Sequence, residues 1–363
     1  MNFEKKMKVF QEHLKKKFDV ALVSPGLNFY YLTGLSPAST LERLFLLVVP
    51  ADGNLVIIAP KLYQNELKSS WISNIVYWED KDDPYEILKI FMANLERKTG
   101  NLLIEDSMPS LILINIMKYI GQYRLEPIST VISKFRIIKN EEDLKCMKRA
   151  ADIVDRVFYD LIEKNLEDKT EIDLATLIDQ LMRNFGAEGT SFETIVASGA
   201  NGANPHHTPG NRKLQKGDLV ILDYGARYQG YCSDITRTIA IGHVSDNEKK
   251  VYEIVKDAQE NAFRSVKAGV KAKEVDYSAR KVIERCGYGA FFSHRTGHGI
   301  GLDAHEEPYI TSTNERILEN GMVFTIEPGI YLSGKFGVRI EDDVLVKKTG
   351  ERLTKAKREL VVL

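Results

Sequence analysis

Helical and strand-like patterns of hydrophobic residues alternate along roughly the first 130 residues of the chain. Apolar residues spaced three or four apart indicate amphipathic helices, and short branched or aromatic runs indicate strands. The predicted elements are helices at about 3–18, 84–98 and 111–120, and strands within 19–25, 42–60 and 101–106. This part contains no Gly-rich phosphate loop, HEXXH motif or nucleophile elbow. The pattern therefore predicts an α/β domain with a structural rather than a catalytic role.

The pattern changes near residues 134–140, where Asn140 can cap a long helix with acidic residues in its first turn. We place a domain boundary here, giving domains at 1–134 and 135–363. Beyond this boundary, the same order of elements occurs twice: a pair of helices followed by a Gly/His-rich stretch and a hairpin. The expected helices lie at about 141–165, 170–185, 247–268 and 273–286. This predicts an α+β domain built as an internal pseudo-duplication.

Each predicted hairpin carries two acidic residues. If the first hairpin, within residues 219–242, folds between Tyr228 and Gln229, Asp223 lies opposite Asp234. If the second, within 321–346, folds about Gly334, Glu327 lies opposite Glu341. Directly opposed residues have Cβ atoms about 4.5–5.5 Å apart, and two carboxylates at that distance repel. Each pair therefore needs a proton or a cation.

These acidic residues have an ordinary alternative, because Asp is common at strand ends and turns. Asp223, however, follows Leu219 and Ile221 on one strand face, which places it on the apolar side. A carboxylate buried on an apolar face is rare unless it is paired or bound to metal. Four such residues together favour a metal site.

Four histidines lie in two short loops punctuated by Gly and Pro. His298 stands in GHGIG, where the glycines permit close approach of the backbone, and His305 follows seven residues later. His206 and His207 stand in NPHHTPG. The GxGxG run lacks the spacing and βαβ context of a nucleotide-binding loop. His298 is the candidate fifth ligand, and the other three are candidate catalytic or ligand-orienting groups.

Four carboxylates and one imidazole suit a pair of divalent ions roughly 3.5–4 Å apart, the arrangement of two-metal hydrolases. The imidazole favours Mn²⁺, Co²⁺, Fe²⁺ or Zn²⁺ over Mg²⁺ and Ca²⁺, which prefer oxygen ligands. The sequence does not rank these four metals.

Composition narrows the classes of partner. Fifty basic and 51 acidic residues give a net charge of −1, which offers no support for binding nucleic acid or an anionic membrane. No apolar run approaches the ~20 residues of a membrane span. Three scattered cysteines without a CxxC motif fit a reducing compartment, so we expect a cytoplasmic protein.

Four segments together resemble a known family: LDYGARYQGYCSDITRT, HRTGHGIGLDAHEEP, TIEPGIY and VRIEDD. They are similar to successive motifs of the proline-specific metallopeptidases of the pita-bread fold, which include prolidase and aminopeptidase P. The resemblance covers the whole chain and implies a creatinase-type α/β N-terminal domain before a pita-bread catalytic domain. All five ligand positions are present in the family's order and spacing.

The resemblance also implies roles for individual residues. Asp223 would hold one metal ion, Asp234 and Glu341 would bridge both, and His298 and Glu327 would complete the second site. A water acidified by two cations, Mn²⁺ or Co²⁺ above all, would attack the peptide carbonyl, and Glu327 would carry its proton to the proline nitrogen. The remaining implied residues are His206 and His305, which would position substrate, and Arg339 and Tyr231, which would orient metal-binding carboxylates.

The family resemblance leaves the substrate length open between two activities. Arg295, three residues before His298, has the fork geometry that suits a substrate carboxylate, which favours an Xaa-Pro dipeptidase. A structural ion pair is the alternative role for Arg295. The alternative activity is an Xaa-Pro aminopeptidase acting on longer peptides, and a remoter one is a non-catalytic peptide-binding relative. In each case the ligands are small peptides with proline second, and the resemblance implies a homodimer whose N-terminal domain helps to wall the partner's active site.

Overall fold

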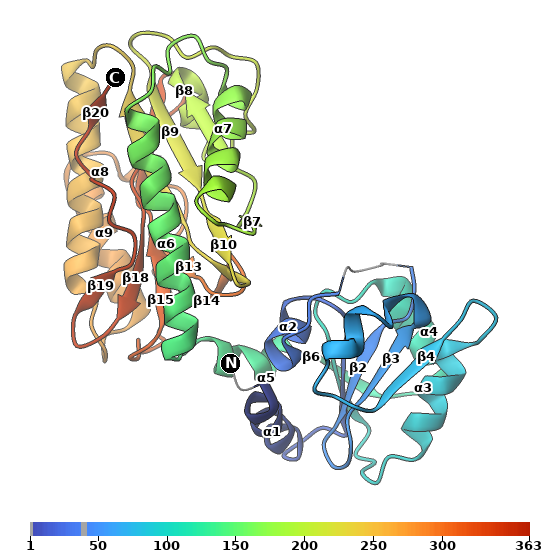
Figure 1. The fold of residues 1–363 in the computed structure, drawn as a ribbon. Coiled ribbons are helices and arrows are strands. Elements are labelled where there is room, and N and C mark those ends of the chain that lie inside the picture. Colours follow the sequence, from blue (N-terminus) through green and yellow to red (C-terminus); the bar gives the residue numbers. More distant parts are fainter. Residues whose placement is uncertain (1–2, 38–41) are drawn as a thin grey trace. The chain divides into compact units, whose positions relative to one another are not determined.

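The computed structural model describes residues 3–37 and 42–363, which divide into two compact units, Met1–Phe135 and Arg136–Leu363 (Figure 1). Each unit has its own buried core of aliphatic and aromatic side chains. Among the described residues, no helix is both long enough and apolar enough to cross a membrane.

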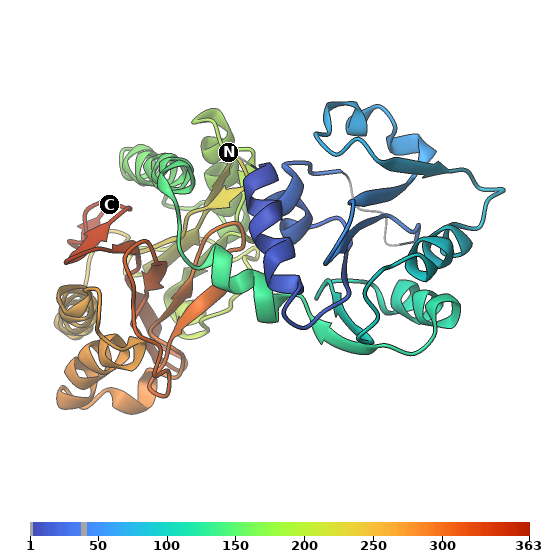
Figure 2. The same ribbon diagram turned by 90° about the horizontal axis from the view of Figure 1, so that it is seen from below.

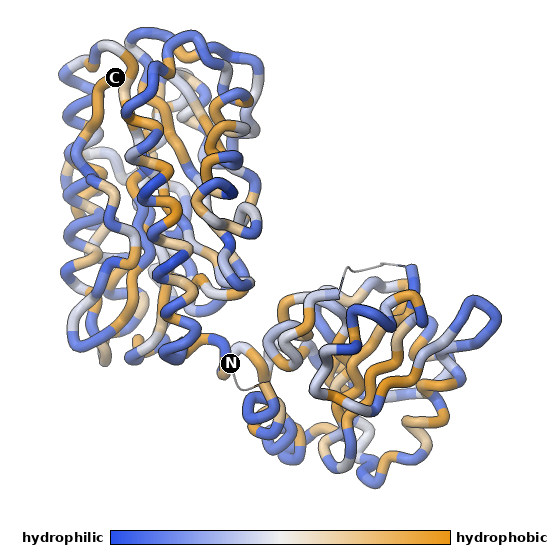
Figure 3. Tube along the Cα trace, viewed as in Figure 1, coloured by the Kyte–Doolittle hydropathy of each residue, from blue (hydrophilic) through white to orange (hydrophobic). Residues whose placement is uncertain are grey.

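The N-terminal unit is built on a six-stranded mixed sheet with the order β4-β3-β2-β1-β5-β6. Its strands are β1 (Val20–Val23), β2 (Leu46–Pro50), β3 (Val56–Pro60), β4 (Ile75–Trp78), β5 (Asn101–Ile104) and β6 (Arg124–Pro127). The central strands β1, β2 and β3 are buried along their whole length, and Figure 3 shows them as the most continuous hydrophobic stretch of this unit. Strands buried on both faces read as unbroken apolar runs, as the sequence does here.

Among the described residues, the α-helices of this unit are α1 (Phe3–Leu14), α2 (Leu27–Thr33), α3 (Pro84–Ala93), α4 (Ser110–Ile120) and α5 (Ser129–Arg136). Two short 3₁₀ helices, η1 (Lys61–Tyr63) and η2 (Glu66–Ser69), follow β3. The three helices expected from the hydrophobic pattern are confirmed, but α1 and α3 end four or five residues early. The Asp83 side chain accepts from the first backbone N–H groups of α3, and Pro84 fills its first position, which is favourable at a helix start.

The C-terminal unit contains two pairs of helices, α6 (Glu141–Ile162) with α7 (Glu171–Asn184), and α8 (Asp246–Ser265) with α9 (Ala272–Arg285). All four predicted helices are confirmed to within about three residues. Asn140, Thr170 and Ser245 each form a capping box with the acidic residue three positions later, which fixes where α6, α7 and α8 begin. Figures 1 and 2 show α8 and α9 side by side.

The strands of this unit form two larger sheets, with the orders β20-β12-β9-β8 and β14-β13-β15-β18-β19, and two small ones, β11-β10-β7 and β16-β17. Their bounds are β7 (Gly189–Thr190), β8 (Ile195–Ser198), β9 (Leu219–Tyr224), β10 (Ala226–Tyr228), β11 (Tyr231–Cys232), β12 (Ile235–Ala240), β13 (Gly297–Gly299), β14 (Glu306–Ile310), β15 (Val323–Ile326), β16 (Gly329–Leu332), β17 (Phe336–Arg339), β18 (Asp342–Val346), β19 (Gly350–Arg352) and β20 (Val361–Val362). The 3₁₀ helices η3 (Gly199–Ala203) and η4 (Gly289–Phe291) lie in the connections. One core joins α6 and α7 to the first hairpin, and a second joins α8 and α9 to the second hairpin. The expected pseudo-duplicated plan is therefore present in the packing.

The register of the first hairpin differs from the expected one by two residues. Asp223 on β9 pairs with Thr236 on β12, not with Asp234. The turn is centred on Gln229 and Gly230, both with positive φ (47° and 78°), one residue later than expected. Directly paired residues lie on one face of a hairpin, so Asp223 and Thr236 share a face. A register shift of two residues does not change which residues of each strand lie on that face. Asp234 lies two residues before that position, in the short connection between β11 and β12.

The register of the second hairpin is the expected one. Thr325 pairs with Asp343 and Ile326 with Asp342, so the next pair in this register is Glu327 opposite Glu341. The turn lies at Gly334, whose φ of 70° favours glycine. This hairpin therefore brings its two acidic residues together as the sequence predicts.

Candidate metal centre

All five predicted metal ligands line one cavity of about 600 Å³ in the C-terminal unit. The cavity is also lined by the predicted residues His206, His305, Arg295 and Arg339, and by His207 and His294. The predicted ligands come from both hairpins and from β13, so the cavity lies where the two halves of the pseudo-duplication meet.

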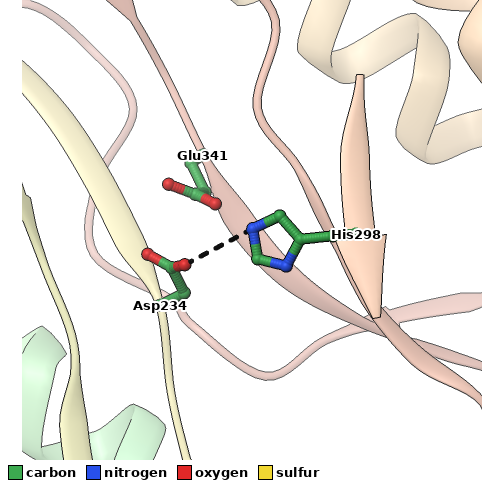
Figure 4. Close-up of side chains that lie close together, drawn as sticks. All are labelled: Asp234, His298 and Glu341. Atoms are coloured by element: carbon green, nitrogen blue, oxygen red, sulfur yellow. Dashed lines mark ion pairs between the residues drawn. The ribbon is translucent and has the colours of Figure 1, made fainter. Parts of the chain in front are cut away.

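Three of the ligands converge closely enough to share an ion. One potential ligand atom from each of Asp234, His298 and Glu341 lies within 4.8 Å of the others, and all three side chains are buried (Figure 4). His298 Nε2 lies 3.8 Å from Asp234 Oδ2 and 3.3 Å from Glu327 Oε1. Its Nδ1 lies 3.1 Å from the Gly299 carbonyl, which can only accept. Nδ1 therefore carries the ring proton, and Nε2 presents its lone pair to the carboxylates.

Two glycines hold His298 in place. A Cβ at Gly297 would lie 1.8 Å from the Thr325 carbonyl oxygen, and one at Gly299 would lie 2.1 Å from that of Glu307. Any side chain at either position would push β13 away from β15 or β14. The close approach expected from the GHG sequence is therefore required by the packing.

Burial and like charge raise the pKa values of the acidic residues. Burial raises the pKa of Asp234 well above its ordinary value, and the carboxylates of Glu341 and Asp223 add to the effect. The pKa of Glu341 is raised in the same way, by burial and then by Glu327 and Asp223. Burial raises the pKa of Glu327 to about 7, although Arg339 opposes the rise. Burial, with His305 nearby, lowers the pKa of His298, so its imidazole is neutral and able to bind metal.

Unpaired buried oxygens show that the site fits a cation. Asp223 Oδ1, Asp234 Oδ1 and Glu341 Oε1 are buried and have no hydrogen-bond partner among the described residues. Leaving a buried acceptor unsatisfied costs about 1–3 kcal/mol, and more when the group is charged. Three such oxygens around one cavity, with a neutral imidazole beside them, are the donor set that divalent cations require.

Arg339 connects the acidic residues of the two hairpins. It is 3% exposed, and its Nη2 donates to Asp223 Oδ2 at 2.5 Å. Its Nε donates to Thr236 Oγ1 at 3.1 Å, and that hydroxyl donates to Glu341 Oε2 at 2.6 Å. Arg339 thus fixes one carboxylate directly and a second through Thr236.

Tyr231 is predicted to orient a carboxylate near Asp234, and that role stays a prediction. Its hydroxyl donates at 2.5 Å to Asp143 on α6, and Tyr231 does not belong to the cavity lining. The residue that supports Asp234 is Asp343, whose Oδ2 accepts from the Asp234 backbone N–H at 3.0 Å. This contact joins positions 109 residues apart in the chain, and neither partner's local sequence indicates it.

His294 and Tyr331, which the sequence did not indicate as site residues, extend the network from Arg339. The Tyr331 hydroxyl accepts from Arg339 Nη1 at 3.0 Å and lies 2.8 Å from His294 Nε2. Burial and the nearby Arg339 lower the pKa of His294 to about 4, so the ring is neutral. The one available signal was the position of His294 four residues before His298 in the same glycine-containing segment.

We expect metal binding at this centre to tighten as the pH rises. The raised pKa values mean that the metal-free carboxylates hold protons, which a cation must displace. The affinity for Mn²⁺ should increase by up to about tenfold per pH unit for each proton released, and the part due to Glu327 should level off above its pKa of about 7. Calorimetric titrations at pH 6 and pH 8, in buffers of different ionisation enthalpy, measure both quantities. Equal affinity at both pH values, without proton release, would contradict this account.

Comparison with known proteins identifies two family regions. Residues 145–348 match the model of metallopeptidase family M24, and residues 7–138 match that of the creatinase/prolidase N-terminal domain. The chain is 38% identical to the Xaa-Pro dipeptidase of Pyrococcus horikoshii, with 99% of each protein covered.

Two solved structures extend the comparison. The crystal structure of a prolidase from Thermococcus sibiricus matches with a TM-score of 0.97 and 53% identity, covering 100% of both chains. The X-Pro aminopeptidase from Thermotoga maritima matches with a TM-score of 0.83 and 35% identity over 95% of this chain and 97% of that one. These matches confirm the expected pita-bread fold with its creatinase-type N-terminal domain. The chain therefore belongs to metallopeptidase family M24.

Proposed function

We propose that this protein is a metal-dependent Xaa-Pro dipeptidase. The observation that carries the proposal is the group of three buried carboxylates, the half-buried carboxylate of Glu327 and one neutral imidazole around a single cavity. The similar proteins from Pyrococcus horikoshii and Thermococcus sibiricus bear the names Xaa-Pro dipeptidase and prolidase.

The five ligands would hold two divalent ions, with Asp234 and Glu341 shared between them and Asp223, His298 and Glu327 completing the sites. Mn²⁺ and Co²⁺ are the favoured ions, and Zn²⁺ and Fe²⁺ also suit the mixed oxygen and nitrogen donors. When bound, such ions polarise the peptide carbonyl and make a water molecule acidic enough to act as the nucleophile.

Glu327 would handle the proton that the reaction requires. The proline nitrogen of an Xaa-Pro bond is a tertiary amide and carries no hydrogen, so it must gain a proton to leave. In the metal-free protein the pKa of Glu327 is raised to about 7, chiefly by burial, so this carboxyl group takes up a proton more readily than an exposed one. Its Oε1 accepts from the Thr325 hydroxyl at 3.3 Å, which directs the carboxylate.

His206 and His305 would bind and orient the substrate carbonyl. Both line the cavity, and the His305 ring centroid lies 4.1 Å from that of His298. Burial, followed by the charge of Arg295, lowers the pKa of His305. A neutral ring still offers one N–H, which would stabilise charge that develops on the carbonyl oxygen.

Arg295 would recognise the substrate's C-terminal carboxylate. Its guanidinium stacks on the Tyr309 ring, 4.6 Å from the centroid, which limits its motion. The side chain lines the metal cavity and also an open groove that contains Glu307 and Arg316. A dipeptide would end at Arg295, whereas a longer peptide would have to continue past it.

Replacement of Arg295 by Ala should therefore weaken dipeptide cleavage far more than tripeptide cleavage. Loss of a charged hydrogen bond, about 1.5–3 kcal/mol, predicts a fall of roughly 10- to 100-fold in kcat/KM for Met-Pro. The fall for Met-Pro-Ala should be less than about threefold, since its carboxylate lies elsewhere. Arg316→Ala is the matched control, because Arg316 lines the open groove and not the metal cavity. Equal losses on both peptides would return Arg295 to a structural role.

The proposed function is tested by turnover of Met-Pro and Met-Pro-Ala, using metal-stripped protein reloaded with Mn²⁺ or Co²⁺. Cleavage of the dipeptide alone supports the dipeptidase. Cleavage of the tripeptide at its first bond supports the second candidate, an Xaa-Pro aminopeptidase, which the open groove beyond Arg295 and the Thermotoga maritima relative favour. Binding of both peptides without turnover would indicate a non-catalytic peptide-binding protein.

We further propose a cytoplasmic homodimer. The homodimer rests on the family resemblance, and the reducing compartment rests on three cysteines that form no disulfide. Light scattering with chromatography measures the assembly directly, and a monomeric mass would contradict it.

A further inference from the structure

A buried carboxylate outside the metal cavity holds the loop that bears two of its histidines. Glu171 is the first residue of α7, is 0% exposed and does not line the cavity. A buried carboxylate needs several hydrogen-bond donors to remain charged, so the donors to Glu171 indicate which part of the structure it holds in place.

Within the part of the chain that the structure describes, the hydrogen-bond donors to the Glu171 side chain all come from one segment, residues 198–210. Its Oε1 accepts from the Ser198 backbone N–H (2.8 Å), the Ser198 hydroxyl (2.7 Å) and Asn201 Nδ2 (3.0 Å). Its Oε2 accepts from His207 Nε2 (2.8 Å) and the Gly210 backbone N–H (3.2 Å). Burial alone would raise the pKa of Glu171, but these hydrogen bonds outweigh it and the pKa is lowered. The carboxylate therefore stays ionised and joins both ends of the segment.

The opposite side of the same segment rests on β17, the strand that carries Arg339. A Cβ at Gly337 would lie 1.8 Å from the Gly202 carbonyl oxygen, so the two backbones are in direct contact. The Pro205 carbonyl accepts from Arg339 Nη1 at 3.4 Å. The segment is thus held between the start of α7 and the strand that organises the metal ligands.

The two adjacent histidines differ in what their rings contact. His207 uses Nε2 to donate to Glu171, whereas the His206 ring makes no hydrogen bond within residues 3–37 and 42–363. Both line the cavity, so His206 is the one whose ring remains available to a substrate. The chain direction at His206 is set by the anchored neighbour.

We propose that Glu171 is a positioning residue that acts through His207 to fix His206 on the wall of the metal cavity. This inference rests on the proposed peptidase function. A general stabilising role for Glu171 at the start of α7 is the alternative, because acidic residues favour helix N-termini. Against that alternative, the five recorded donors to the Glu171 side chain lie in residues 198–210 and none lies in α7.

The substitution Glu171→Gln distinguishes the positioning role from the general stabilising role. A carboxamide keeps one acceptor oxygen and places an NH₂ group at the other position. With the oxygen toward Ser198 and Asn201, the NH₂ group faces the Gly210 N–H and displaces His207. We expect kcat to fall about 10- to 100-fold, as for a small misplacement of a catalytic group, with KM changed less than about threefold. The amount of Mn²⁺ bound per chain, measured by calorimetry, should stay unchanged, since Glu171 does not contact a predicted ligand.

Two substitutions of His207 give an independent test if Glu171→Gln folds poorly. His207→Gln keeps an N–H that can reach Glu171 and should retain most of kcat, whereas His207→Leu should lose as much as Glu171→Gln. Asp155→Asn is the matched control, because Asp155 is a buried carboxylate that accepts backbone N–H groups from Lys355 and Ala356, away from the cavity. It should lower the melting temperature but leave kcat within about twofold.

Nitrogen-15 NMR of the histidine rings tests the hydrogen bond without any substrate. The His207 Nε2 proton should exchange slowly with water in the unsubstituted protein and rapidly in Glu171→Gln. Inactivity of the unsubstituted protein on both peptides would overturn the proposed function and this inference with it. An active protein whose kcat is unaffected by Glu171→Gln or His207→Leu would overturn this inference alone, as would equal losses in Asp155→Asn.

Discussion

Replacing Asp234 by Asn should abolish metal-dependent turnover and yet raise the melting temperature of the metal-free protein. The first effect follows because Asp234 belongs to the close group with His298 and Glu341. An amide carries no charge and its NH₂ group cannot bind a cation, so Asn would offer one weak ligand atom where the carboxylate offers two. Loss of several kcal/mol of metal-ion catalysis corresponds to a fall of ~10³-fold or more in kcat/KM.

The second effect follows from the electrostatics of the metal-free cluster. Burial and the charges of Glu341 and Asp223 raise the pKa of Asp234 in the folded protein. A carboxyl group whose pKa is raised on folding stabilises the fold at low pH and loses that contribution as the pH rises through the folded pKa. At pH 8, above the unfolded-state pKa, the metal-free protein therefore bears the cost of this unfavourable site, either as a bound proton or as charge repulsion, and the Asp234→Asn substitution would remove that cost. Each kcal/mol relieved should raise the melting temperature by about 2–4 °C, with a smaller gain at pH 6.

Melting curves with and without Mn²⁺ measure both effects at once. The unsubstituted protein should gain stability from Mn²⁺, whereas Asp234→Asn should gain little. The control is Asp257→Asn, on the exposed face of α8, which should leave turnover and both melting temperatures unchanged. Full activity of Asp234→Asn, or a metal-free protein that melts at a lower temperature, would refute the cluster as described.

The features that the sequence predicted correctly depend on local chemistry. The expected starts of α6, α7 and α8 lie within one residue of the observed ones, because Asn140, Thr170 and Ser245 cap the next few backbone N–H groups; Asn140 is the one of these caps predicted from the sequence. The second hairpin is correct because Gly334 marks its turn. Arg339 and Glu341 both line the cavity, as expected for positions two apart on a strand, where side chains alternate in direction.

The features that the sequence did not predict depend on contacts between distant segments or on unusual backbone. Gln229 adopts a positive φ that residues other than glycine rarely take, so the first turn was placed one residue early. Tyr231 donates to Asp143, which is 88 residues away on α6. The Glu171 side chain likewise accepts hydrogen bonds from residues that lie 27 to 39 positions further along the chain. Nothing in the sequence near either residue indicates such partners, because they are chosen by the packing of whole elements.

Replacement of Arg339 by Met should be the most destabilising single change near the cavity. Arg339 is 3% exposed and pairs with Asp223, and its other donors reach Tyr331 and Thr236. Removing one partner of a buried ion pair leaves an uncompensated charge and typically costs about 3–5 kcal/mol. Methionine fills similar space, so the loss would report charge and hydrogen bonding rather than volume. Urea denaturation of the metal-free protein measures the loss as a lower transition midpoint.

Bound metal should mask part of this cost, because divalent cations supply the positive charge that Asp223 would otherwise lack. The difference between Arg339→Met and the unsubstituted protein should therefore be smaller with saturating Mn²⁺ than without it. Adding Asp223→Asn to Arg339→Met should recover part of the metal-free stability, since the unpaired carboxylate is then removed. It should not recover turnover, because Asp223 is also a proposed ligand.

Arg264→Met is the matched control for the lost positive charge. Arg264 pairs with Glu260 on α8 with 73% of its side chain exposed, and exposed pairs contribute at most about 1 kcal/mol. Arg339→Met with a midpoint as little changed as that of Arg264→Met would mean that Asp223 does not depend on the guanidinium. A loss that is the same with and without Mn²⁺ would mean that Arg339 and the cations do not neutralise the same charge. The predicted results require that Arg339 neutralises part of the negative charge of the carboxylate cluster whether or not metal is bound. The rest of that negative charge is then available to bind metal ions.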